Sequence, residues 1–107
     1  MEVKMSEQVT QEMIEEWKSK YGEIYKIDLA GEDYYYRPLK RAEYKGIVQT
    51  PETAPSFREE QIVTKCVIFP KIDAVAIAAS KAGVVSTLTD YVMLVSGFGS
   101  DSEPVKL

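Results

Sequence analysis

Residues 10–38 read TQEMIEEWKSKYGEIYKIDLAGEDYYYRP, and the hydrophobic period along them changes once, at Gly22. Before Gly22, apolar residues recur at helical spacing, and Thr10 stands where it can cap the first turn. After it, polar and apolar residues alternate as far as Pro38, with the glycine-containing turn Ala30–Asp33 in between. The stretch therefore predicts a helix over 11–21 followed by a β-hairpin.

The remainder of the chain favours helices. Residues 39–49 are mostly helix formers, and Ala74–Ala79 is rich in alanine. Ser56 and Glu59 have the spacing of a capping box, in front of an apolar stripe that continues to Pro70. Three of the expected helices therefore cover residues 39–49, 56–69 and 74–79.

A last helix is expected near the C-terminal end. Gly83 is interpreted as a stop, Ser86 as the next N-cap, and Gly97 as the end of this helix. A hairpin alone is marginally stable, so it must pack on the helices. We therefore expect an α+β fold with an N-terminal helix, one β-hairpin and a bundle of three to four short helices.

The length and composition indicate one domain. The chain has 107 residues, of which 45% are apolar and 28% charged, as in ordinary globular proteins. We expect a flexible N-terminus at residues 1–9, a single α+β domain at 10–98 and a flexible tail at 99–107.

The charge and the cysteine content narrow the function classes. The net charge is −4, which argues against a nucleic-acid binder, although a local basic patch within residues 17–45 stays open. Cys66 is the one cysteine, so this chain forms no internal disulfide, which is typical of an intracellular protein. No signal peptide or membrane-spanning run is recognisable, and we expect a cytoplasmic protein with no membrane partner.

The residues do not predict an active site. The chain has no histidine, the commonest general base and metal ligand. The acidic residues Glu12, Glu15 and Glu16 are interpreted as a solvated helix start, and Cys66 as a core side chain on the apolar stripe. We expect no enzyme activity, no catalytic residue, no metal site and no cofactor.

The aromatic residues are the candidates for partner binding. Tyr34 and Tyr36 share one face of the predicted hairpin and Tyr35 occupies the other, so one of the two sets is expected to be exposed. Tyrosine is enriched at protein interfaces, but these rings can equally cover a small sheet. Trp17 and Met13 share one side of the first helix, where they either anchor the core or contact a partner.

Three segments resemble one family. They are WKSKYGEIY (residues 17–25), YYRPLKRAEYK (residues 35–45), and a discontinuous set over residues 58–70, 82–88 and 96–98. In these segments, the chain resembles the small tail assembly chaperones of long-tailed bacteriophages. The resemblance covers roughly residues 13–98.

The resemblance implies a non-catalytic chaperone that coats the tape measure protein during tail morphogenesis. It makes Tyr34, Tyr36 and Phe98 candidate contacts, besides Met13 and Trp17, and it implies the host cell cytoplasm as the location. Self-association is left open. Two alternatives remain: a small structural virion subunit of the baseplate or tail adaptor type, and a phage-encoded inhibitor of a host protein.

Overall fold

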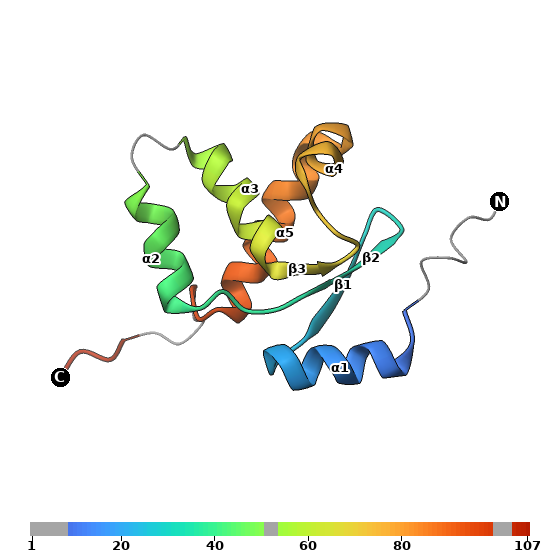
Figure 1. Cartoon of the computed structure of the whole chain (residues 1–107). Coiled ribbons are helices and arrows are strands. Elements are labelled where there is room, and N and C mark those ends of the chain that lie inside the picture. The colour runs from blue at the N-terminus through green and yellow to red at the C-terminus, as the bar shows by residue number, and fades with distance from the viewer. Residues whose placement is uncertain (1–8, 51–53, 100–103) are drawn as a thin grey trace.

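The computed structural model describes residues 9–50, 54–99 and 104–107, which form an α+β fold (Figure 1). The elements are α1 (Gln11–Tyr21), β1 (Tyr25–Leu29), β2 (Glu32–Tyr36), α2 (Arg41–Gln49), α3 (Pro55–Cys66), β3 (Val67–Phe69), α4 (Ala74–Ala79) and α5 (Ala82–Val95). This order confirms the predicted fold class and adds a short third strand. Residues 1–8 and 100–103 of the predicted flexible ends lie outside the described residues, and the flexibility of both ends stays a prediction.

The first helix begins and ends where the sequence predicts. The Thr10 hydroxyl accepts a hydrogen bond from the backbone N–H of Met13 at 3.2 Å, which satisfies one unpaired donor of the first turn. Gly22 ends the helix with a φ of 93°, a conformation that glycine adopts without steric cost.

The hairpin forms with a tighter turn than predicted. Tyr25 pairs with Tyr36 and Leu29 with Glu32, which leaves only Ala30 and Gly31 in the turn. Both have positive φ values, 55° and 83°, as the favoured two-residue hairpin turn requires. Glu32 and Asp33, which the sequence placed in the turn, therefore belong to β2.

The stripe predicted as one helix to Pro70 instead divides into α3 and β3. The helix stops at Cys66, and Val67–Phe69 pairs antiparallel with β2 to give the sheet order β1-β2-β3. The predicted capping box is also wrong, because α3 starts at Pro55 with Ala54 at the N-cap. The Glu59 carboxylate instead accepts a hydrogen bond from the Ser86 hydroxyl at 2.9 Å.

Two other helix starts differ from the prediction. The last helix begins at Ala82, so Gly83 lies inside α5 and Ser86 is an internal residue that faces α3. The second helix begins at Arg41, two residues after Leu39, because Leu39 is drawn into the core. At α5, tertiary contacts override the local capping signal of Ser86.

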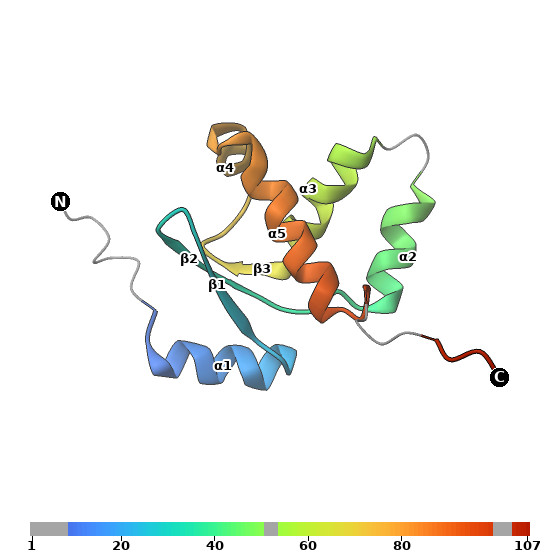
Figure 2. The same cartoon turned by 180° about the vertical axis from the view of Figure 1, so that it is seen from behind.

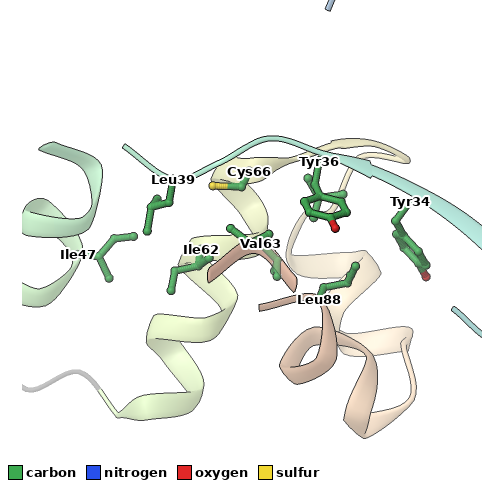
Figure 3. Close-up of a cluster of buried hydrophobic side chains, with 10 residues drawn as sticks. Tyr34, Tyr36, Leu39, Ile47, Ile62, Val63, Cys66 and Leu88 are labelled. Atoms are coloured by element: carbon green, nitrogen blue, oxygen red, sulfur yellow. The ribbon is translucent and has the colours of Figure 1, made fainter. Parts of the chain in front are cut away.

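The sheet has two different faces. Tyr34 and Tyr36 point toward α3 and α5, whereas Tyr35 points the other way, toward Trp17 on α1. Figure 2 shows α5 running beside α3, with α1 set apart from both. The main core lies between β2 and the α3/α5 pair (Figure 3) and contains Tyr34, Tyr36, Leu39, Ile47, Ile62, Val63, Cys66, Val67, Leu88 and Val92.

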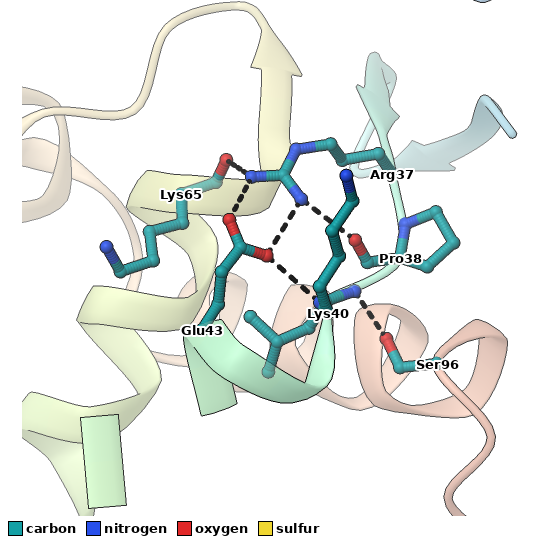
Figure 4. A network of polar contacts seen from close by, with 7 residues as sticks. Arg37, Pro38, Lys40, Glu43, Lys65 and Ser96 are labelled. Carbon is teal, nitrogen blue, oxygen red and sulfur yellow. Dashed lines mark hydrogen bonds and ion pairs between the residues drawn. The ribbon is translucent and has the colours of Figure 1, made fainter. Parts of the chain in front are cut away.

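A charged clamp fastens the end of the hairpin to α2 and α3 (Figure 4). The guanidinium of Arg37 donates to both carboxylate oxygens of Glu43, at 2.8 and 3.0 Å. It also donates to the carbonyl oxygens of Lys65 at 3.1 Å and Pro38 at 3.0 Å. The hydrogen bonds from Arg37 hold the pKa of Glu43 at about 2, well below its usual 4.5.

The same loop is tied to the end of α5. The backbone N–H of Leu39 donates to the Ser96 hydroxyl at 2.7 Å, and that hydroxyl donates to the Val92 carbonyl at 2.6 Å. Residues 37–40 therefore make polar contacts with α2, α3 and α5. The opposite end of the hairpin, at its turn, has no such clamp among the described residues and borders a groove.

Candidate protein-binding groove

An apolar groove of about 410 Å³ lies between the hairpin turn and the α4/α5 corner. We call it the hairpin groove. Its wall comes from four segments: the hairpin, the turn after β3, α4 and the first half of α5. The apolar lining includes Leu29, Tyr34, Ile72, Ile77, Val84 and Leu88.

The groove exists because α4 is short and carries small side chains. Asp73 starts this helix by accepting a hydrogen bond from the backbone N–H of Ala76 at 2.9 Å. Ala76 and Ala79 then line the groove on the α4 side, and a methyl group reaches only a short way across it. Across from them, Tyr34 and Leu88 close the bottom of the groove, with exposed fractions of 9% and 0%.

The rim of the groove carries charges of both signs. Lys71 and Lys81 stand on the helical side and Glu32 on the hairpin side. Burial, followed by the negative charge of Glu32, raises the pKa of Tyr34, so this phenol stays neutral at physiological pH. Ser80, on the wall, donates its hydroxyl hydrogen bond to the Ile77 carbonyl at 2.9 Å. The groove therefore offers apolar contact inside and charge at its rim.

The two predicted tyrosine contacts are not surface residues. Tyr34 forms the bottom of the hairpin groove, and Tyr36 is 4% exposed in the core, with its ring 5.8 Å from that of Tyr25. Of the two sets that the sequence left open, the Tyr34/Tyr36 pair is therefore the buried one. Tyr35 is the half-buried tyrosine on the opposite face.

Trp17 packs α1 against the sheet, whereas Met13 contacts the cap of its own helix. The Trp17 ring lies 5.5 Å from the ring of Tyr35 and 6.2 Å from that of Phe69, so it spans β2 and β3. The Met13 sulfur lies 3.5 Å from the backbone nitrogen of Thr10, within the cap of the helix. Both side chains are partly buried.

Phe98 is accessible to solvent, but it lies at the C-terminal end of α5, whereas the groove uses the N-terminal half. It is 38% exposed and its ring lies 5.2 Å from that of Tyr44 on α2. Leu94, one turn earlier, is 58% exposed. The groove uses the first half of α5 and Phe98 follows its last turn, so the structure does not bring the five candidates into one site.

The sequence alone did not identify three residues of the groove, Ile72, Ile77 and Val84. Residues 70–79 did contain a signal for a groove. A proline turn followed by an alanine-rich helix leaves space next to larger side chains. The strand β3, which the helical spacing of Cys66 and Val67 obscured, ends directly before the groove residues 70–72.

Cys66 is a core residue, as expected. Its side chain is 0% exposed, and burial raises the pKa of the thiol to about 11. The thiol is therefore protonated at neutral pH and a poor nucleophile.

Within residues 9–50, 54–99 and 104–107, no group of three His, Cys, Asp or Glu side chains is placed to hold a metal ion. No helix in these ranges combines the length and apolar character needed to cross a membrane.

Comparison with protein-family models, with curated proteins and with solved structures finds no match to this chain.

Proposed function

We propose that this protein is a non-catalytic tail assembly chaperone that binds an amphipathic helix of the phage tape measure protein in the hairpin groove. The observation that carries the proposal is the groove itself, an apolar depression of about 410 Å³ with a charged rim. The sequence resemblance to tail assembly chaperones supplies the identity of the client.

The chemistry of the groove suits one face of a helix. Protein grooves that bind amphipathic helices accept apolar side chains at successive turns, at positions such as i, i+3 and i+4. Leu29, Ile77 and Val84 offer matching apolar surface. Lys71 and Lys81 on the rim can pair with acidic residues that flank the apolar stripe of such a helix.

The modest size of the groove also suits a chaperone that must leave its client. One groove makes a weak contact, because few side chains fit into it. Many copies along a long tape measure helix keep it covered, while each copy can still be displaced by a tail tube subunit. A tight single site would oppose that exchange.

The test is co-expression with the tape measure protein of the same phage, followed by size-exclusion chromatography with light scattering. Ala79 lines the groove at the end of α4, so Ala79→Arg places a long cation there without opposing the helix dipole. Its neighbour Ala78 is exposed and does not line the groove, so Ala78→Arg is the matched control.

We expect the unmodified chain and Ala78→Arg to keep the client soluble with several copies bound, and Ala79→Arg to lose most of the complex. Equal binding by the two variants would exclude the hairpin groove as the client site. A client that precipitates beside the unmodified chain would overturn the chaperone proposal. Finding the protein in purified virions would instead favour a structural subunit.

A further inference from the structure

The strand β1 lies at an edge of the sheet. The strand order is β1-β2-β3, so in the described part of the chain β1 pairs with β2 on one side and with no strand on the other. An open edge carries backbone N–H and C=O groups that can pair with another strand. Which strand can pair with this edge depends on the side chains of β1.

The side chains of β1 alternate between two environments. Tyr25, Ile27 and Leu29 are partly buried, whereas Lys26 and Asp28 are exposed on the outer face. Any added strand must keep this alternation, because a slip of one residue would turn its apolar set toward solvent.

The outer face of the hairpin carries charges of opposite sign at its two ends. Lys26 lies near Lys18 of α1, around a cavity that both residues line. At the end near the turn, Asp28 stands directly opposite Asp33 of β2. Like charges in this arrangement destabilise a strand pair, and neither aspartate forms an ion pair with another described residue.

We propose that a second copy of this chain pairs with β1, antiparallel and centred on Ile27. In this register Lys26 of each copy lies opposite Asp28 of the other, and the two Ile27 residues lie opposite each other. The arrangement has two-fold symmetry, so one self-complementary contact is made twice. Each lysine then offsets the repulsion between Asp28 and Asp33 in the other copy.

Other pairings of the same two strands are less favourable. A shift of two residues brings Lys26 opposite Lys26, or Asp28 opposite Asp28, and parallel pairing in register does the same. Only the pairing centred on Ile27 gives two attractive charge pairs and keeps the apolar residues on the core side. Lys26 and Asp28 thus disfavour the pairing of β1 with unrelated strands. Their opposite charges favour its pairing with a second copy of the chain.

The position of α1 is compatible with this pairing. Its residues Ile14 and Lys18 lie near Lys26, at the end of the hairpin away from the turn. Antiparallel pairing puts this end beside the turn end of the second copy, so the two α1 helices lie at opposite ends of the joined sheet. The lysines at positions 18 and 26 then face the Asp28 and Asp33 end of the other copy.

This inference does not rest on the proposed chaperone function, since the probe is the chain itself. Sedimentation over a concentration series measures self-association of the purified protein and of three variants. Lys26→Asp and Asp28→Lys each turn both charge pairs repulsive. The double variant Lys26→Asp/Asp28→Lys exchanges the charges and restores attraction.

We expect the unmodified chain to form a dimer and each single variant to associate at least about tenfold more weakly. An equimolar mixture of the two single variants should form a heterodimer, and the double variant should dimerise again. Asp28→Lys also faces Asp33 with an opposite charge, so it should retain or raise the melting temperature while losing the dimer. A purely structural role of these residues would not give rescue on mixing.

A monomer at every concentration would overturn the proposal. So would single variants that dimerise as the unmodified chain does, or a mixture that stays monomeric. Should Lys26→Asp fail to fold by circular dichroism, Asp28→Lys against the unmodified chain still tests the proposal, since this variant must then lose the dimer while it stays folded.

Discussion

Removing the charge of Glu43 should destabilise the whole fold, because this carboxylate pairs with a guanidinium that is 10% exposed. Glu43→Gln keeps the size of the side chain but leaves Arg37 without its anionic partner. The pKa of Glu43 is about 2 rather than 4.5, which corresponds to an upper limit of about 3 kcal/mol. The carboxylate side chain is 27% exposed, so solvent screening reduces the expected loss to about 2 kcal/mol.

The assay is urea unfolding of the unmodified chain and Glu43→Gln, with the exposed α1 substitution Glu16→Gln as the control. A loss of about 2 kcal/mol should also lower the melting temperature by about 10 °C for a domain of this size. The control should change the free energy of unfolding by less than about 0.5 kcal/mol.

The pH dependence of the free energy of unfolding tests the role of Glu43 more specifically. The folded-state pKa of Glu43 is depressed, so its stabilising contribution is complete above about pH 4.5 and is lost as the pH falls toward 2. The difference in unfolding free energy between the unmodified chain and Glu43→Gln should therefore shrink over this window. A difference that is constant with pH, or no larger than that of Glu16→Gln, would refute the assigned role of the clamp.

Two further predictions concern the hairpin turn and the core. Ala30 has a φ of 55°, which is unfavourable for alanine, so Ala30→Asn should raise the free energy of unfolding by about 0.5–1 kcal/mol in urea titrations, and Ala30→Val should lower it. Cys66 is buried and its pKa is about 11, so the native protein should react with a thiol reagent only as fast as the chain opens. Rapid labelling of the folded protein at neutral pH would show that the core around α3 is open.

The first part of the fold was predictable because its signals are local. Thr10 and Gly22 delimit α1, and the change to a period of two after Gly22 marks β1. These capping and periodicity signals involve residues that are close in sequence, and the folded chain retains them. The Ala30–Gly31 turn then sets the register of β2 against β1.

The groove and the buried tyrosine face depend on contacts distant in sequence. Alternation shows that Tyr34 and Tyr36 share a face, but α3 and α5 decide that this face is the buried one. The strand β3 has only three residues, and its spacing continues the helical stripe of α3, so only its pairing with β2 identifies it. Ser86 likewise carries a capping signal that its hydrogen bond to Glu59 replaces.

Methyl NMR of the purified chain during titration with an amphipathic tape measure peptide tests the central claim most directly. If the client helix binds in the hairpin groove, the methyl resonances of Ile72, Ile77 and Val84 should shift together as peptide is added. Val75, which is 78% exposed and does not line the groove, should stay unchanged. Shifts confined to Leu94 and the surroundings of Phe98, or no shifts at all, would contradict a client site in the groove.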